Sequence, residues 1–396
     1  MARWLVFLLF LAVWPSTHAN TPDDVFSKVV GQARKAAAAP FRPNEMSLPE
    51  VLHNLNYDTY RDITFRQEQG LWHGRSPFEI QFFHPGYLFK QPVVIHEVRA
   101  DEVRIVPFEQ KYFRYPDFFV ARLGDKTLLS FAGFRVLYPL NNPGRLDEVI
   151  SFVGSNYFRA LGRDQAYGIS ARGVAIDTGE GLTEEFPDFR EFWLCRPAKG
   201  ARSMQIFAFL DGPTVAGAYR FKIEPGLETT VAVEAHLFFR KSEDVLGLAP
   251  LTSMFWRGEQ EPATSHDPRP EVHDSDGLMI ETASGEREWH PLRAVDHVST
   301  ESFPETNPKS FGLLQRDRDP SHYRDREAKY ERRPSVRVES SSTWGSGKVR
   351  LMQLPAANEY NDNVVAFWQP AKAPPPGAEL EFEYRLHWFK RESNKE

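Results

Sequence analysis

The segment Asn358–Pro370, NEYNDNVVAFWQP, places two acidic residues, Glu359 and Asp362, directly before an apolar run with the character of a β-strand. Hydrolysis of a glycosidic bond needs one carboxylic acid to protonate the leaving oxygen and one carboxylate to activate water. The acid must keep its proton, and an apolar setting raises its pKa. Asp362, flanked by Tyr360 and the apolar run, suits this role.

A second acid, Asp274, lies on the turn-like segment Arg269–Gly277 (RPEVHDSDG) and suits the role of the water-activating base. The chain has 54 acidic residues, so their pattern alone does not single out this pair. The run His273–Asp276 lacks the spacing and the glutamate of a calcium-binding loop, and no histidine spacing matches a metal motif. We therefore expect no metal and no cofactor.

Strands have to position these acids. Alternating apolar and polar residues predict strands at Phe78–Phe82, Met204–Leu210, Tyr219–Ile223 and Thr230–Leu237. Short turns with glycine or proline separate the strands, and no long helices are interleaved, which favours an all-β antiparallel sandwich. Short helices are predicted only near the N-terminus, the first with Val25, Phe26, Val29, Val30 and Ala33 on one face.

The C-terminal end has a different pattern. The prolines around residues 371–379 predict a linker, because proline cannot join the interior of a sheet. The next segment, Leu380–Phe389, alternates cleanly and predicts one amphipathic strand with no partner after it. Either this strand pairs back onto the main domain, or it begins a second β-domain that is cut off at Glu396.

The N-terminus and the composition bear on location and partners. Residues 1–19 combine one positive charge, Arg3, with an apolar run and a small final residue, which predicts a secretory signal peptide cut after Ala19. The run is shorter than the roughly 20 apolar residues of a membrane-spanning helix. The net charge of −6 argues against nucleic acid as a partner. The single cysteine, Cys195, excludes a disulfide scaffold, and the whole pattern suggests the bacterial periplasm.

Two further segments are rich in residues that could contact a ligand. Tyr157–Thr178 (YFRALGRDQAYGISARGVAIDT) contains many Gly, Arg, Tyr and Asp residues and is typical either of a loop that lines a polar cleft or of a plain surface loop. Arg332 and Arg333, near Tyr330, could contact hydroxyls or carboxylates. The 31 phenylalanines suit sugar-binding faces, although a sheet-rich core explains most of them.

Taken together, these segments identify a family. YFRALGRDQAYGISARGVAIDT, EEFPDFREFWL, GLAPLTSMFW, RPEVHDSDGL, SFGLLQRDRD, YERRPSVRVE and NEYNDNVVAFWQP resemble, in this order, segments of the periplasmic glucan biosynthesis proteins of the MdoG/OpgG/OpgD family. The resemblance runs from about Val25 to Trp388. Because several long motifs occur in the same order, this resemblance is far more specific than one short motif.

The resemblance implies a fold and a domain organisation. The family makes or trims osmoregulated periplasmic glucans, which have a β-1,2-linked glucose backbone. Its main domain is a large, galactose-mutarotase-like β-sandwich with a long cleft, followed by a smaller immunoglobulin-like β-domain. We therefore expect a signal peptide at 1–19, the sandwich at 20–370, a linker at 371–379, and at 380–396 the first strand of a truncated second domain.

The resemblance also implies an activity and a set of site residues. Members of the family that are enzymes are inverting endo-β-1,2-glucanases, and some relatives transfer the glycosyl group instead. By motif position, Asp362 is the general acid and Asp274 the general base. Tyr330, Arg333 and Glu359 line the reaction centre, with Tyr330 as a member of a proton relay and Glu359 binding hydroxyls or setting the pKa of Asp362. Inversion places the two carboxyl groups about 6.5–9.5 Å apart, and a relay allows more.

Other functions stay open at this point. The same cleft and aromatic residues would suit a non-catalytic glucan-binding scaffold that guides a membrane glucan synthase. A structural β-sandwich of the cell envelope without sugar affinity is a third possibility. The expected ligand is a β-1,2-linked glucan, and a membrane glucan synthase is a candidate partner.

Overall fold

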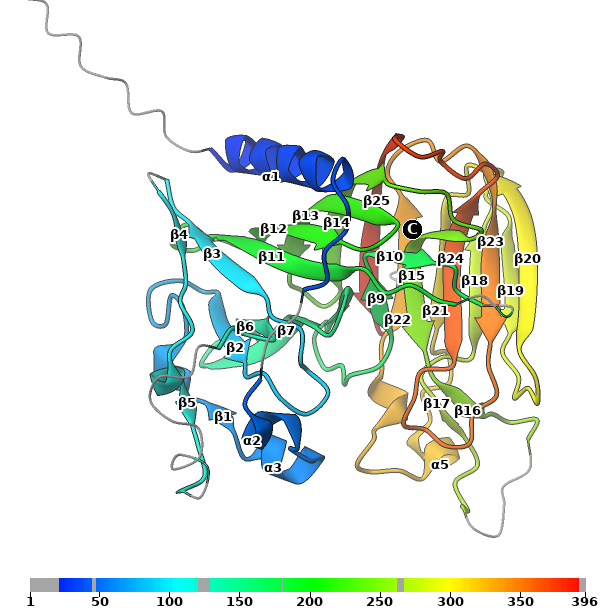
Figure 1. The fold of residues 1–396 in the computed structure, drawn as a ribbon. Helices are drawn as coiled ribbons and strands as arrows, with labels where there is room; N and C mark the ends of the chain where they lie inside the picture. The colour runs from blue at the N-terminus through cyan, green and yellow to red at the C-terminus, as the bar shows by residue number, and fades with distance from the viewer. Residues whose placement is uncertain are drawn as a thin grey trace, which may run out of the picture.

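A computed structural model describes residues 21–44, 48–100, 102–117, 119, 129–179, 181, 183–261 and 267–391. The predicted signal peptide lies outside the described residues. Among the described residues, no helix is long and apolar enough to cross a membrane. Most of the described chain forms strands of two large, mainly antiparallel sheets (Figure 1).

One large sheet has ten strands in the order β2-β6-β7-β8-β9-β15-β24-β23-β20, with β10 paired to β15. Its strands are β2 (Glu79–Phe83), β6 (Gly133–Asn142), β7 (Arg145–Val153), β8 (Tyr157–Ala160), β9 (Ser170–Arg172), β10 (Val174–Ile176), β15 (Leu246–Ser253), β20 (Ser299–Thr306), β23 (Ser346–Gln353) and β24 (Val364–Pro370). The two strands that flank the predicted acid Asp362, β23 and β24, pair with each other, and β24 also pairs with β15.

The other large sheet has eleven strands in the order β19-β18-β21-β22-β25-β14-β13-β12-β11-β3-β4. Its strands are β3 (Val94–Val98), β4 (Val103–Ile105), β11 (Asp188–Cys195), β12 (Met204–Asp211), β13 (Val215–Glu224), β14 (Thr229–Phe239), β18 (Gly277–Glu281), β19 (Arg287–Pro291), β21 (Ser310–Leu314), β22 (Ser335–Ser340) and β25 (Glu379–Phe389). All neighbours in this sheet are antiparallel except β3 and β11. Two small sheets pair β1 (Thr64–Phe65) with β5 (Phe113–Arg114), and β16 (Phe255–Arg257) with β17 (Val272–His273).

An aromatic core fills the space between the two large sheets. Phe152 and Phe158 of the ten-stranded sheet lie with their ring centres 5.1 and 5.2 Å from that of Phe221 in the eleven-stranded sheet. Phe158 also approaches Trp388, which is fully buried. Burial of such rings is the main favourable contribution to a core of this kind. The prediction of an all-β sandwich is confirmed, and many of the phenylalanines belong to this core.

The N-terminal helix α1 (Pro22–Ala37) covers the outer face of β12, β13 and β14 (Figure 1). It begins at a capping box in which Thr21 accepts a hydrogen bond from the N–H of Asp24. Val25, Phe26 and Val29 are buried against the sheet, as the helical pattern predicts. The remaining described helices are short: α2 (Glu50–His53), α3 (Tyr57–Arg61), α5 (Pro320–Tyr323) and the 3₁₀ helices η1 (Gln67–Gln69), η2 (Gln110–Tyr112) and η3 (Tyr330–Arg332).

The C-terminal strand β25 corrects one expectation. It lies inside the eleven-stranded sheet, paired with β14 on one edge and with β22 on the other. Its alternate side chains Leu386 and Trp388 are fully buried in the sandwich core. The assignment of 380–396 to a separate immunoglobulin-like domain is therefore wrong for this strand, and the proline-rich segment 371–379 connects the two sheets of one sandwich. Of the two alternatives that the sequence leaves open, pairing back onto the main domain is the one found.

Candidate active site

Asp362 lies at the end of the loop that joins β23 to β24. The next residue, Asn363, is buried and fastens this loop: its Nδ2 donates to the carbonyl oxygens of Phe255 (2.9 Å) and Leu354 (2.8 Å), and its Oδ1 accepts from the N–H of Phe255 (2.8 Å). Asp362 as a whole residue is exposed, but protein atoms surround its carboxyl group and desolvate it. Tyr360 is 83% exposed, so it does not supply the apolar setting that the sequence predicts for Asp362.

Asp274 directly follows β17, which pairs with β16. The N–H of Asp274 donates to the carbonyl oxygen of Met254 (2.7 Å). The hydroxyl groups of Ser253 and Ser275 form a buried hydrogen bond of 2.7 Å. These contacts fix the loop of Asp274 to residues 253–255, which lead from β15 into β16.

The same three residues therefore hold both acids. Besides its side-chain bonds to Phe255, Asn363 donates its N–H to the carbonyl oxygen of Ser253 (3.0 Å). Asp362 and Asp274 are far apart in the chain, yet both are tied to this β15–β16 junction (residues 253–255). Asp274 is bound to it directly through its own N–H, and Asp362 through the next residue, Asn363. Buried hydrogen bonds are costly to break, so the junction positions the two loops relative to each other.

The segment predicted to line the site, Tyr330–Arg333, faces Asp274. Arg333 forms an ion pair with the Asp274 carboxylate through Nη1 and Oδ1. Its guanidinium carbon lies 4.2 Å from the ring centre of the buried Tyr330. The backbone of Gly168 approaches closely from the other side, since a Cβ atom at this position would lie 2.9 Å from the Cβ of Arg333. Part of the polar segment Tyr157–Thr178 therefore borders the site.

Glu359 is held by an arginine. Arg269 Nη2 lies 2.5 Å from Glu359 Oε2, and its Nη1 lies 2.8 Å from Asp325 Oδ2. Arg269 also pairs with Asp267 at 2.6 Å. One guanidinium thus joins three carboxylates from three segments, which places Glu359 in a defined orientation near Asp362.

Desolvation of the carboxyl groups raises the pKa of both candidate catalytic acids. The pKa of Asp274 rises to about 6, mainly because the residue is buried, and the charge of Asp362 raises it further while Arg333 lowers it. The pKa of Asp362 is also raised by desolvation, against the opposing effects of Arg159, Thr252 and Arg333. Because Arg333 pairs with Asp274 and acts on Asp362, the two acids share one electrostatic environment.

Tyr330 belongs to the same environment. Burial raises the pKa of its phenol well above the ordinary value, the charges of Glu359 and Asp274 raise it further, and Arg333 lowers it. The phenol therefore stays protonated and can donate as well as accept a hydrogen bond. The structure brings all five predicted residues together, and their catalytic roles stay a prediction.

Two arginines at the site are missing from the sequence prediction. Arg159, on β8, weakens the rise in the pKa of Asp362 and lies with its guanidinium carbon 5.5 Å from the ring centre of Tyr167. Arg269 is the residue that holds Glu359. Arg159 falls in the polar segment singled out above, and Arg269 begins the segment that contains Asp274. Nothing in those patterns distinguishes these two arginines from their neighbours.

Comparisons with known proteins agree with the resemblance. Residues 25–396 match the model of the family described as periplasmic glucan biosynthesis protein, MdoG. The chain is 46% identical over 396 residues to a glucans biosynthesis protein G of Ralstonia nicotianae, covering 99% of this chain and 77% of the relative. It is 46% identical to a glucans biosynthesis protein D 1 of the same organism, over 95% of this chain and 72% of the relative. A glucans biosynthesis protein G of Pseudomonas syringae pv. tomato is 43% identical, over 94% of this chain and 57% of the relative.

Solved structures are more distant. A galactose mutarotase related enzyme from Lactobacillus acidophilus aligns with 67% of this chain and 96% of its own, at 8% identity and a TM-score of 0.29. At this TM-score the likeness adds nothing to the β-sandwich described above.

Proposed function

Because this chain belongs to the periplasmic glucan biosynthesis protein family, we propose that it processes the β-1,2-linked backbone of osmoregulated periplasmic glucans as an inverting endo-β-1,2-glucanase. Asp362 is the general acid and Asp274 the general base. The observation that carries this proposal is the shared anchoring of the two acids: residues 253–255 hold both loops, and desolvation raises the pKa of both carboxyls.

The proposed reaction is a single displacement. Asp362 gives its proton to the glycosidic oxygen as the bond between that oxygen and the anomeric carbon breaks. Asp274 removes a proton from the water whose oxygen forms the new bond on the opposite face of the sugar. The proton that the base gains and the one that the acid loses are exchanged with solvent afterwards, so the enzyme returns to its starting state.

The neighbouring residues support these two roles. Arg333 stabilises the ionised form of Asp274, which a base requires. The protonated phenol of Tyr330 can pass a proton between the water and Asp274 when the two are not in direct contact. Glu359, oriented by Arg269, binds sugar hydroxyls next to the acid.

The first experiment measures reducing ends released from linear β-1,2-glucan by the wild type, Asp362→Asn and Asp274→Asn. We expect each variant to lose about 10²- to 10⁴-fold in rate, because each lacks one proton-transfer group. Asp296→Asn is the matched control, since Asp296 is a carboxylate whose side chain is 92% exposed. Equal release by the wild type and Asp362→Asn would remove the catalytic proposal.

A second experiment distinguishes the acid from the base, because desolvation raises the pKa of both carboxyls. A β-1,2-linked oligosaccharide that carries 2,4-dinitrophenol as its leaving group needs little protonation of that group. Asp362→Asn should therefore recover most of its rate on this substrate, whereas Asp274→Asn should not. The reverse result would exchange the two roles. Products longer than the starting glucan would identify glycosyl transfer to a sugar acceptor.

One contact favours a second candidate function. Arg333 occupies the carboxylate of the proposed base, which suits a site that binds glucan without turnover. In that case the chain would be a glucan-binding scaffold that acts with a membrane glucan synthase. Calorimetry with linear β-1,2-glucan would then show binding, while long incubation would release no reducing ends from the wild type.

We also propose that the chain reaches the periplasm through the signal peptide at 1–19. The family is periplasmic by description. The N-terminal sequence of the protein recovered from the periplasm should begin at Asn20, and a periplasmic protein that begins at Met1 would contradict this cleavage site.

A further inference from the structure

A group of histidines and carboxylates lines a pocket next to the loop that carries Asp274. The pocket has about 530 Å³ of space and is lined by residues of β16, β17, β19 and α5. Figure 1 shows β16, β17 and α5 close to one another. Among the described residues, two sets of three potential metal ligands share one member here, and the ligand atoms of each set lie within 4.8 Å of one another. The sets are Glu271, His273 and Asp276, and Glu271, Asp317 and His322.

The surroundings of His273 fix its tautomer. Gln315 Nε2 donates to the carbonyl oxygens of His273 (3.0 Å) and Tyr330 (3.2 Å), so Gln315 Oε1 is free to accept. This oxygen lies 2.9 Å from His273 Nδ1, which must therefore carry a hydrogen. The other ring nitrogen, Nε2, faces Glu271 Oε2 at 3.0 Å. In a neutral imidazole, Nε2 would direct its lone pair at a carboxylate oxygen, so a cation, either a proton or a metal ion, has to lie between them.

Both of these groups are buried, with His273 1% and Glu271 3% exposed. Asp276 adds a second carboxylate, with Oδ1 3.8 Å from His273 Nε2. Two carboxylates therefore face one ring nitrogen of a histidine that is almost fully buried. A doubly charged cation would neutralise them.

Backbone and side-chain contacts orient each of these three groups. The N–H groups of Arg316 and Asp317 both donate to Asp276 Oδ2, the second at 3.1 Å, which leaves Oδ1 directed at His273. Gln315 orients the ring of His273 in the same way. Metal-binding histidines and carboxylates in proteins have outer partners of this kind, which hold one atom and leave the other for the ion.

The second set lies towards solvent. Asp317 Oδ1 accepts from the N–H of Asp319 (2.9 Å), and its Oδ2 lies 2.5 Å from Nδ1 of His322. His322 Nδ1 is 3.9 Å from Glu271 Oε1, and its side chain is 49% exposed. Asp317 and His322 thus lie beside Oε1 of Glu271, whereas Oε2 of Glu271 faces His273.

We propose that this pocket binds one divalent transition-metal ion through Glu271, His273 and Asp276, with water from the pocket at the open position. A set of nitrogen and oxygen donors without sulfur suits Zn²⁺ or Mn²⁺, and three protein ligands plus water is a common zinc arrangement. Because His273 precedes Asp274, the ion would also hold the loop of the proposed base. The site does not depend on whether the protein hydrolyses glucan.

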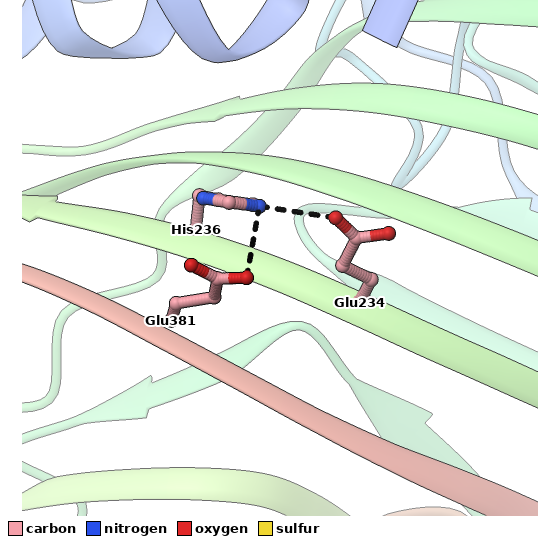
Figure 2. A group of neighbouring side chains, drawn as sticks. All are labelled: Glu234, His236 and Glu381. Carbon is pink, nitrogen blue, oxygen red and sulfur yellow. Dashed lines mark hydrogen bonds and ion pairs between the residues drawn. The ribbon is translucent and has the colours of Figure 1, made fainter. Parts of the chain in front are cut away.

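A second cluster provides a matched control. His236 Nε2 lies 3.1 Å from Glu234 Oε1 and 3.9 Å from Glu381 Oε1, on the adjacent strands β14 and β25 (Figure 2). Here Arg220 already pairs with Glu234 at 3.2 Å, and the side chain of Glu381 is 59% exposed. A guanidinium thus already pairs with one carboxylate of this strand cluster.

The test uses the full chain after removal of metals with a chelator, and Zn²⁺ alone as the probe. Equilibrium dialysis should show one bound ion per chain in the wild type and in His236→Gln, together with a rise in Tm. Asp276→Asn keeps one oxygen that can accept from the backbone N–H groups, but it replaces the charged carboxylate by a neutral amide. It should bind Zn²⁺ at least about tenfold more weakly, since loss of an outer partner of a metal ligand alone has an effect of this size. Glu271→Gln is the second variant, in case Asp276→Asn lowers the Tm of the metal-free protein.

Two results would overturn the proposal. One is a wild type that takes up no Zn²⁺ and shows no change in Tm, which would leave a proton between His273 and Glu271. The other is unchanged Zn²⁺ affinity in both Asp276→Asn and Glu271→Gln, which would place any bound ion elsewhere.

Discussion

Two groups of charged residues on this sandwich are built in different ways. The group of Glu234, His236 and Glu381 stands on two neighbouring strands, so register alone brings its members together (Figure 2). The candidate active site combines Asp274, Asp362 and Arg333 from loops that are distant in the chain. The first arrangement follows from strand pairing, whereas the second exists only because specific buried contacts hold the loops.

The difference shows where function is more easily lost. On the strands, a substitution removes one charge and leaves the backbone in place. At the candidate site, the carboxyls depend on the β15–β16 junction, so substitutions that never touch a ligand can displace them.

The largest effect is expected from Asn363→Ala. This change removes three side-chain hydrogen bonds to backbone groups, two of them buried, and should lower the free energy of unfolding by about 2–4 kcal/mol. It should also lower glucan hydrolysis, because Asp362 is the preceding residue. Glu381→Gln, on the exposed strand face, should change the free energy of unfolding by less than about 0.5 kcal/mol. Urea unfolding of the two variants checks this prediction, and equal stability would contradict it.

Arg333→Gln should lower hydrolysis by roughly 10²-fold, because Asp274 loses the charge that favours its ionised form. Arg333→Lys keeps the charge and should retain more activity than Arg333→Gln. Arg220→Gln removes the guanidinium that pairs with Glu234 and should leave the hydrolysis rate unchanged. The order of the three rates is the measurement, and a slow Arg220→Gln would show that the two regions are coupled.

Gly168→Ala tests the close approach of two backbone segments at the site. The added methyl group would lie 2.9 Å from the Cβ of Arg333, so we expect a loss of about 1–3 kcal/mol in stability and a displaced Arg333. Gly31→Ala is the matched change in helix α1, where a Cβ meets no atom within 4 Å. It should raise stability by about 0.5–1 kcal/mol, because alanine is the better helix former. Shifts of Tm with the same sign in both variants would contradict this account.

The smallest effect concerns pH and His236. A hydrogen bond to Glu234 raises the pKa of His236, the charges of Glu381 and Glu379 raise it further, and burial opposes this rise. Phe26 of α1 packs against the ring without a charge, and Arg220 faces Glu234. A raised folded-state pKa adds stability that is complete below the unfolded pKa of about 6.5 and is lost as the pH rises through the folded pKa.

The expected contribution is below about 1 kcal/mol, because these groups are partly exposed. The stability difference between the wild type and His236→Gln should therefore shrink between pH 6 and pH 9. A constant difference over this range would show that His236 titrates alike in the folded and unfolded states.

The sequence predicts some of these features better than others. Alternation along Leu380–Phe389 predicts a strand, but a period of two residues does not say which strands lie beside it. The assignment to a separate domain rests on the family resemblance alone and is wrong for this strand. The burial of Val25 and Phe26 was predictable, since a helical face needs only local spacing.

The residues of the candidate site also differ in how far the sequence predicts them. The pair Asp274 and Asp362 came from the family resemblance, because 54 acidic residues offer too many pairs. Arg159 and Arg269 could not be predicted, since their roles depend on loops that meet only in the folded chain. The two ligand sets of the pocket could not be predicted for a related reason: their histidines, His273 and His322, have no metal-motif spacing, and they come close to Glu271 only in the folded chain.

The most direct test of the central claim follows the anomeric configuration of the first product by proton NMR. Wild-type protein is mixed with linear β-1,2-glucan, and the new reducing ends are observed before they mutarotate. Because water attacks the face opposite the leaving group, the account predicts that the α-anomer appears first. Initial release of the β-anomer, or the absence of any new reducing end, would contradict an inverting reaction between Asp362 and Asp274.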